Sequence, residues 1–213
     1  MTQPSIPKAP PRRRRKEARP AEIVAAAMAV FADVGFAAAR MDEIARRAGV
    51  AKGTVFVYFP TKNDLFRAVA QSVLAVNFEP LRLMADQPLD RIVPLLLARA
   101  AYVGDTPVAA VVRLLIAEAR TFPDLAQVWH DEVVSQMLGF LTAAIEAAQA
   151  RGEARAGDAR LYAFSVIGPM MAGFMFRQVF AETDVQLPDL QALATQHVAV
   201  VLDGLMNDPM PGI

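Results

Sequence analysis

Two short helices separated by a tight turn are the feature of this sequence that most restricts its fold. Apolar residues recur at helical spacing over residues 41–48, and Gly49 follows them, where a left-handed backbone conformation can end a helix. A second short helix is expected through about Val57, because Pro60 forces Phe59 towards an extended conformation. The spacing leaves room for only a short turn between the two helices.

Longer helices are expected on both sides of this pair. The apolar period is helical from Pro20 to Val34, and Gly35 suits the position just past the end of a helix. The residues from Thr61 to Asp64 predict a capping box that opens a long fourth helix, which Pro80 should end or kink. Two short helices with a glycine-containing turn, braced by longer helices, are typical of a helix-turn-helix module.

The same segment resembles the DNA-binding domain of the TetR/AcrR family of bacterial transcriptional regulators. The resemblance covers roughly residues 20–67. It rests on an ordered series of short motifs, Gly35-Phe36, Ile44-Ala45, Ala48-Gly49-Val50, Lys52-Gly53-Thr54, Tyr58-Phe59, Lys62 and Leu65-Phe66, a run far longer than a generic helix-turn-helix signal. It implies an all-α protein of about nine helices, in which a three-helix DNA-binding domain precedes a larger helical domain for ligand binding and dimerisation.

Residues 52–58 are the candidate DNA-reading surface, because a recognition helix enters the major groove with its N-terminal end leading. Gly53 has no side chain and lets the helix approach the phosphates closely, while Lys52 can neutralise a phosphate and Thr54 can bond a base edge or a phosphate. The resemblance implies that DNA is contacted by Lys52, Gly53, Thr54, Val55, Phe56 and Tyr58, and that Lys62 meets a phosphate. Packing inside the small domain is the alternative for Val55 and Phe56, and the preferred interpretation for Phe59.

Several positions depart from the family's usual pattern. Ala39 and Arg40 replace hydroxyl residues that commonly cap the second helix, and Ala51 replaces a serine often found before the third. Arg40 could meet a phosphate by charge, and Glu43 could reach back to the Arg40 backbone as half of a capping box. Phe56 lacks the hydroxyl of a tyrosine often present there. These departures motivate an alternative hypothesis, a dimeric small-molecule binding module with a degenerate helix-turn-helix.

Charge is divided unequally along the chain although its formal net charge is zero. Residues 1–67 hold thirteen basic and six acidic side chains, a net charge of +7, so residues 68–213 carry −7. Such asymmetry points to a nucleic-acid or membrane contact by the basic part. The basic arm Arg12, Arg13, Arg14 and Arg15 could follow the DNA backbone or enter a minor groove, with a solvated tail as the alternative. Arg46 and Arg47 fit either a solvated helix face or a contact with the DNA backbone.

Four segments are expected along the chain. They are a disordered basic arm over residues 1–19, the helix-turn-helix domain over 20–66, the ligand-binding and dimerisation domain over 67–207, and a frayed tail over 208–213. Leu161–Phe176, the longest uncharged stretch of the C-terminal half, has sixteen residues, fewer than the ~20 that a membrane-spanning helix needs. A buried helix is therefore expected there, in a cytoplasmic protein without a membrane partner.

The C-terminal domain contains only helical signals. Helices are expected over 92–103, from Thr106-Pro107 onward, over 123–151, over 158–182 and over 188–205. The resemblance implies that the last two pair with their copies as a four-helix dimer interface. Its candidate residues are Phe164, Met175, Leu190, Ala194, His197, Val201 and Leu205.

The resemblance also implies a pocket for a small, largely apolar effector between the fifth, sixth, seventh and eighth helices. Methionine and aromatic side chains suit such a pocket because they adapt to irregular shapes. The candidates are Tyr102, Arg113, Glu118, Phe122, Trp129, His130, Met137, Phe140, Met171, Phe174 and Gln178. For each of the apolar residues plain core packing is the alternative, and for the polar ones a surface position or a satisfied buried group.

Catalysis and metal binding have no support in the sequence. There is no cysteine, and the two histidines, His130 and His197, are sixty-seven positions apart, so no zinc-like cluster is expected. Glycine-rich phosphate loops and the Gly-x-Ser-x-Gly elbow are absent, which disfavours an enzyme and gives no reason to expect a cofactor. The leading hypothesis is a homodimeric repressor that binds a pseudo-palindromic DNA operator and is released by a small apolar effector.

Overall fold

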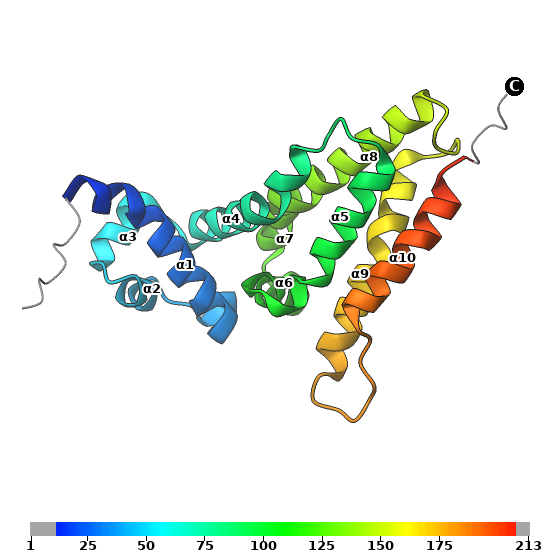
Figure 1. Cartoon of the computed structure of the whole chain (residues 1–213). Coiled ribbons are helices and arrows are strands. Elements are labelled where there is room, and N and C mark those ends of the chain that lie inside the picture. Colours follow the sequence, from blue (N-terminus) through cyan, green and yellow to red (C-terminus); the bar gives the residue numbers. More distant parts are fainter. Residues whose placement is uncertain (1–11, 208–213) are drawn as a thin grey trace, which may run out of the picture.

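Ten α-helices dominate the computed structural model, which describes residues 12–207 and contains no β-strand within that range (Figure 1). The N-terminal part consists of α1 (Arg12–Ala38), α2 (Met41–Arg47), α3 (Lys52–Tyr58) and α4 (Lys62–Arg82). The larger part, here called the body, consists of α5 (Leu89–Ala101), α6 (Pro107–Glu118), α7 (Pro123–Trp129), α8 (Ser135–Ala150), α9 (Ala159–Phe180) and α10 (Leu190–Leu205). The predicted all-α class is confirmed.

Helix α1 begins earlier than the sequence predicted. It starts at Arg12 and passes through Pro20, whereas the prediction placed residues 12–19 in a disordered arm and the helix start at Pro20. Arginine, lysine, glutamate and alanine all favour helix, and here they outweigh the backbone hydrogen bond that the proline removes. The rest of the predicted arm, residues 1–11, and the predicted tail, residues 208–213, lie outside the described residues.

Local signals at the helix ends are confirmed. Gly35 has φ 77° and ψ 174° and interrupts α1, and Gly49 has φ 65° after α2. At the start of α4, Thr61 Oγ1 accepts the Asp64 N–H at 3.0 Å and Asp64 Oδ2 accepts the Thr61 N–H at 3.0 Å, which is the predicted capping box. Pro80 does not end α4, which continues to Arg82.

The body has one more helix than predicted, because a π-helical turn at His130–Val134 divides the long helix expected over 123–151 into α7 and α8. Single π-turns of this kind occur mostly inside α-helices and often at functional sites. Val133 of this turn is buried. The turn therefore lies against the interior of the protein.

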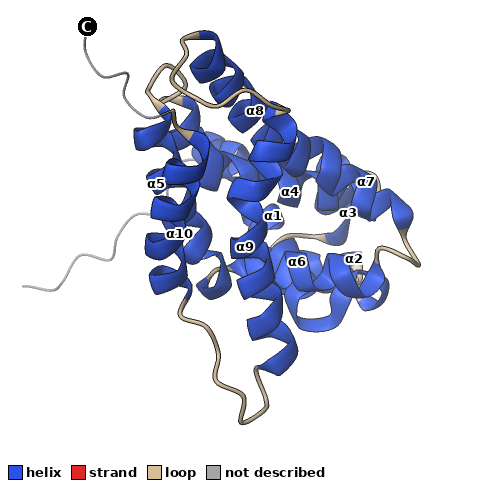
Figure 2. Cartoon of the chain, turned by 90° about the vertical axis from the view of Figure 1, so that its right-hand side faces the viewer, coloured by secondary structure: helices blue, strands red, loops and turns tan. Residues whose placement is uncertain are grey.

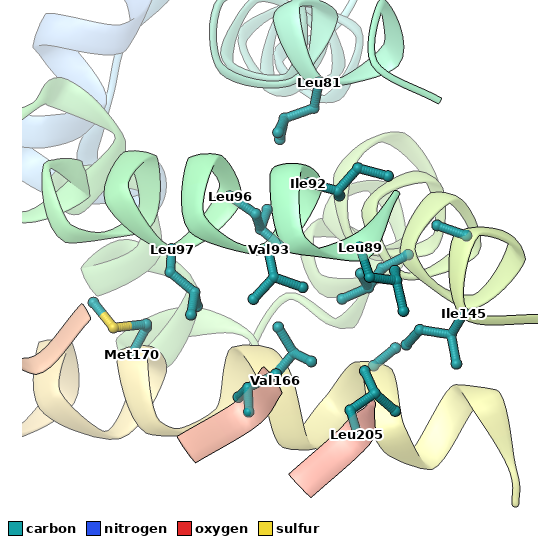
Figure 3. Close-up of a cluster of buried hydrophobic side chains, with 14 of the residues drawn as sticks. Leu81, Leu89, Ile92, Val93, Leu96, Leu97, Ile145, Val166, Met170 and Leu205 are labelled. Carbon is teal, nitrogen blue, oxygen red and sulfur yellow. The ribbon is translucent and has the colours of Figure 1, made fainter. Parts of the chain in front are cut away.

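The main core of the body lies between α5, α8, α9 and α10. Figure 3 shows Val93 and Leu97 of α5 above Val166 of α9 and Leu205 of α10, with Ile145 of α8 closing one end. All five side chains are buried. This core holds α10 against α5 and α9 within a single chain.

A second core joins the helix-turn-helix part to the body. The ring centroid of Phe36 lies 5.5 Å from that of Phe31 and 5.9 Å from that of Phe66. It also lies 5.6 Å from the ring centroid of Phe122, which precedes α7. The same cluster includes buried side chains of α6 and α7, namely Val111, Leu114, Leu115, Leu125 and Val128. Helix α6 accordingly packs beside α1 (Figure 2). The DNA-binding part therefore shares its core with the body.

Three helical stretches, 19–38, 123–150 and 159–180, are long and apolar enough to cross a membrane by length and composition. The last of these is α9, which contains Leu161–Phe176 and extends beyond it to 22 residues, in agreement with the helix predicted over 158–182. Its apolar composition has a different explanation in this fold, since Ala163, Val166 and Met170 face the body core.

Candidate nucleic-acid interface and effector cavity

The turn between α2 and α3 is closed by backbone hydrogen bonds around Gly49. The Gly49 N–H donates to the Arg46 carbonyl at 3.2 Å, and the Val50 N–H donates to the Ala45 carbonyl at 3.0 Å. The positive φ of Gly49 lets the chain make this reversal without the steric penalty of a side chain. Helix α3 then begins only a few residues later, as a helix-turn-helix requires.

Helix α3 presents one face to solvent and one to the core. Lys52 and Gly53 are exposed, Phe56 is 42% exposed, and Thr54 and Tyr58 are partly buried. Val55 is completely buried in the second core and does not belong to the predicted reading surface. The core needs an apolar residue on the inner face of so short a helix, and Val55 fills that place.

Neither α2 nor α3 has a side-chain cap at its N-terminus. Arg40, which precedes α2, instead forms a bidentate pair with Asp42, with Nε to Oδ1 at 3.1 Å and Nη2 to Oδ2 at 3.0 Å. This pair lowers the pKa of Asp42 to about 2, chiefly through the hydrogen bonds from Arg40. The Arg40 side chain stays largely exposed, so a phosphate contact remains a prediction.

Glu43 does not form the predicted capping box with the Arg40 backbone. Its carboxylate accepts hydrogen bonds from Arg46 at 2.7 and 2.8 Å and from Arg47 Nε at 2.8 Å, and Arg47 also pairs with Asp33. Hydrogen bonds from Arg46 and then Arg47 lower the pKa of Glu43 to about 2. Two guanidinium groups hold this carboxylate more strongly than one backbone N–H could.

Lys62 is placed differently from the prediction. Its ammonium group donates to the carbonyl oxygens of Phe36 at 2.6 Å, Ala37 at 3.2 Å and Ala39 at 3.0 Å, and it lies 4.5 Å from the Phe36 ring centroid. Burial lowers the pKa of Lys62, and the charge of Glu118 opposes that shift. All three N–H donors of the ammonium are used inside the protein, so Lys62 is not available for the predicted phosphate contact.

The predicted basic arm lies at the start of α1. The backbone of Arg12, Arg13, Arg14 and Arg15 is helical, but their side chains lie outside the description. Their contact with DNA stays a prediction.

A cavity of about 150 Å³ lies between α4 and the body helices. Its lining is almost entirely apolar and includes three predicted pocket residues, Met137, Met171 and Phe174. Among the described lining residues, the one with a charged side chain is Arg99 of α5. An apolar cavity of this size can enclose a molecule such as benzene. Ligand binding itself stays a prediction.

The sequence missed the contribution of α4 to this cavity. Val73, Leu74, Phe78 and Leu81 line it, together with Val108 and Val112 of α6. An apolar helix face has the same spacing whether it packs against a core or surrounds a cavity, so no local signal separates the two.

Eight predicted pocket residues do not line the cavity. Tyr102 is exposed, Arg113 donates to Gln178 at 2.7 Å, and His130 pairs with Asp131 at 2.9 Å. Phe122 and Trp129 pack against the second core, and Phe140 packs edge-on against Phe78. The carboxylate of Glu118 accepts the backbone N–H groups of Phe36 and Ala37. Each of these side chains contacts another part of the protein or solvent instead of the cavity.

The predicted dimer residues divide into a group that is buried or engaged within the chain and a group that is exposed. The apolar stripe of α10 is buried in the core of its own chain, so it does not form the predicted dimer interface. Its residues are Leu190, Ala194, Val201 and Leu205. His197 is also engaged within the chain, with Nε2 3.0 Å from the Val166 carbonyl oxygen. Phe164 and Met175 are exposed on α9, and Leu161, Met171 and Val179 are exposed on the same face, at intervals of three, four or seven residues along the helix. This exposed stripe leaves α9 with an apolar outer face.

Two family models match the chain. Residues 23–69 match the bacterial regulatory proteins of the tetR family, and residues 92–203 match the C-terminal domain of AefR-like transcriptional repressors. The second match alone covers more than half of the chain.

Relatives of known class match a part of the chain. The transcriptional regulator RutR of Escherichia coli strain K12 is 35% identical over 82 residues, 38% of this chain and 39% of RutR. The transcriptional activator FasR of Mycolicibacterium smegmatis is 45% identical over 56 residues, 26% of each chain. The chain thus matches about two-fifths of the length of RutR and about a quarter of FasR. Both relatives are regulators of transcription rather than enzymes.

Solved structures share the whole fold. The crystal structure of the regulator FadR from Bacillus subtilis in complex with stearoyl-CoA has a TM-score of 0.73 at 21% identity, and the alignment covers 86% of this chain and 98% of FadR. The helix-turn-helix geometry, the two family matches and this fold agree, and the chain belongs to the TetR family of bacterial transcriptional regulators.

Proposed function

We propose that the protein is a homodimeric, ligand-responsive repressor that leaves a pseudo-palindromic DNA operator when a small apolar effector binds. The observation that carries this proposal is the exposed leading end of α3, on a part of the fold that shares its core with a cavity-bearing body. The helix proposed to contact DNA and the cavity proposed to bind the effector thereby belong to one packed unit. The C-terminal match to AefR-like repressors favours repression, and FasR shows that a relative can activate.

Lys52, Gly53, Thr54 and Phe56 form the proposed contact with DNA. Lys52 supplies a charge for a phosphate, and Gly53 lets the backbone of α3 come close to the DNA. In a dimer, two copies of α3 would read successive major grooves about 34–36 Å apart.

The exposed stripe of α9 supports the homodimer. Large exposed apolar patches usually mark interaction sites, because leaving them in water costs free energy. A second copy offers the same stripe, so a two-fold contact would bury both at once. The site of action on DNA also supports a cytoplasmic location.

The cavity supports an effector that is mainly hydrocarbon. Its lining is almost entirely apolar, which disfavours a polar molecule, and Arg99 places one positive charge at its wall. FadR was crystallised with stearoyl-CoA, which makes acyl compounds the first probes to use. Octanoic acid, dodecanoic acid and stearoyl-CoA should be compared, and binding of one of them should raise the melting temperature by mass action.

Selection of genomic DNA fragments by the purified full-length protein tests the function. We expect enrichment of a fragment with two inverted half-sites, with an affinity that falls steeply as salt rises. Transcription from that fragment in vitro then distinguishes a repressor from an activator. If no fragment binds in a salt-dependent way, the alternative of a binding module with a degenerate helix-turn-helix replaces the proposal.

A further inference from the structure

Glu118, the last residue of α6, ties the body to the helix-turn-helix part. Its Oε1 accepts the Phe36 N–H at 3.0 Å and its Oε2 accepts the Ala37 N–H at 2.9 Å. The amides belong to the two residues after Gly35, where α1 is interrupted. A single carboxylate from the body thus satisfies two backbone donors at the junction between α1 and α2.

Gly35 is shaped for this contact. Its φ of 77° is a conformation that residues with side chains rarely adopt, and a Cβ atom built there would lie 2.3 Å from Glu118 Oε1. A side chain at position 35 would therefore push the carboxylate away. The glycine supplies both the turn and the space that Glu118 occupies.

Lys62 holds the opposite side of the same peptide groups. Its ammonium donates to the carbonyls of Phe36 and Ala37, whose N–H groups face Glu118, and to the carbonyl of Ala39. Residues 36–39 lead into α2, and Lys62 is the first residue of α4, which follows α3. Glu118 thus holds the segment before α2 on the body, and Lys62 ties that segment to the start of α4, which follows α3.

The location of Glu118 needs an explanation beyond ordinary helix chemistry. The C-terminal end of a helix carries the negative end of its dipole, where a carboxylate is unfavourable. Helix α6 also has no basic residue in its last turn to compensate. The two amide donors from residues 36 and 37 supply the missing compensation, so the contact accounts for an acidic residue at this end of α6.

Helix α6 connects this contact with the cavity. Val108 and Val112 in its first two turns line the cavity, and Glu118 lies at its other end, about 18 Å from the helix start at the usual rise per residue. Val111, Leu114 and Leu115 meanwhile pack into the second core. A displacement of α6 at the cavity would move the carboxylate at its far end.

We propose that Glu118 is a positioning residue, which sets the orientation of the helix-turn-helix on the body. The part of this proposal that concerns DNA rests on the proposed function. The contact with residues 36 and 37 does not, and it can be measured without DNA.

Amide hydrogen exchange of the full-length protein tests the contact. In Glu118→Gln, an amide nitrogen faces one of the two N–H groups, and exchange at Phe36 and Ala37 should become about tenfold faster. Gly35→Ala should give the same local change by displacing the carboxylate. Glu146→Gln, an exposed change of the same kind on α8, should leave both amides unchanged. Unchanged exchange in Glu118→Gln and Gly35→Ala overturns the proposal.

Binding to DNA tests the positioning role. A full operator requires two recognition helices at a fixed spacing, whereas a single half-site requires only one. Glu118→Gln should therefore weaken binding to the full operator about tenfold and leave binding to a half-site duplex nearly unchanged. An equal loss on both duplexes, or on neither, would show that Glu118 has no positioning role. If wild-type protein binds no DNA, the proposed function fails while amide exchange still decides the contact.

Discussion

Arg67 of α4 donates a hydrogen bond from Nη1 to the Glu132 carboxylate at 2.5 Å, and so joins the helix that leaves the DNA-reading part to the π-helical turn of the body. The other oxygen of Glu132 accepts from Gln71 Nε2 at 3.0 Å. The side chain of Glu132 is 17% exposed, and its neighbour Val133 lines the cavity. The turn is thereby held against α4 at a point next to the cavity.

Replacing Glu132 with glutamine should lower the free energy of unfolding by about 1 kcal/mol, because a charged hydrogen bond is lost from a partly buried site. Urea unfolding followed by the fluorescence of Trp129, the single tryptophan, measures this change next to the turn. Glu153→Gln removes an exposed pair with Arg151 and should change stability much less. Equal effects of the two substitutions would contradict the structural role given to Glu132.

Val55 and Val57 are neighbours on α3 with opposite roles. Val55→Ala removes buried methyl groups and should destabilise the protein by about 2 kcal/mol. Val57 is 78% exposed, and Val57→Ala should stay within about 0.5 kcal/mol of wild type. Thermal unfolding of both variants checks the burial of this helix. A larger loss from Val57→Ala would mean that the helix faces the other way.

Lys52 should contribute to DNA affinity in a salt-dependent way. Lys52→Ala should weaken binding to all DNA sequences and reduce the slope of log affinity against log salt by about 1, as expected for one lost phosphate contact. Fluorescence anisotropy over a range of salt concentrations gives this slope. Arg91→Ala removes the same charge from the exposed surface of α5 and serves as the matched control. A slope unchanged in Lys52→Ala removes this residue from the interface.

Glu43 should make stability depend on pH in the acidic range. Its pKa falls from about 4.5 in the unfolded chain to about 2 beside Arg46 and Arg47, so the unfolded state binds the proton more readily. The contribution of Glu43 is complete above pH 4.5 and is lost as the pH falls through 2. A carboxyl ¹³C titration of the folded protein should give a midpoint near 2. Glu43→Gln should flatten the loss of stability over this range, and an ordinary midpoint would show that the pairing is absent in solution.

Phe164 should matter for assembly. Phe164 is 50% exposed on α9, and Phe164→Glu would place a charge in the proposed contact between two copies, which should shift the protein from dimer to monomer. Sedimentation velocity at several concentrations measures the shift. Leu83→Glu introduces the same charge at a residue that is 82% exposed outside α9 and should leave the dimer intact. A dimer that persists in Phe164→Glu must use another surface.

Features set by neighbouring residues could be predicted from the sequence. The capping box of Thr61 and Asp64 and the turn at Gly49 involve groups only a few positions apart, so their chemistry is visible in the sequence itself. The same holds for the helix-turn-helix, whose motifs specify a known geometry. Most element types and several helix ends could be predicted for this reason.

Features set by distant residues could not be predicted in this way. Glu118 meets amides 81 and 82 positions away, and its local sequence does not identify those partners. Likewise, the period of Leu190, Ala194 and Val201 shows that one face of α10 is covered, but not that α5 of the same chain covers it. An acidic residue at the end of α6, where the helix dipole disfavours it, was the one available sign that Glu118 has a special partner.

The shared core around Phe36 limits how this protein can be cut and recombined. A fragment ending within α4 would expose Phe36, Leu65 and Phe66, which are buried together with residues of α6 and α7. Such a fragment should be poorly soluble, and a hybrid regulator made by joining this DNA-reading part to a foreign sensor would keep its packing only if α6 and α7 were transferred as well. A segment exchanged between regulators therefore has to include α6 and α7, although these helices follow the helix-turn-helix part in the sequence.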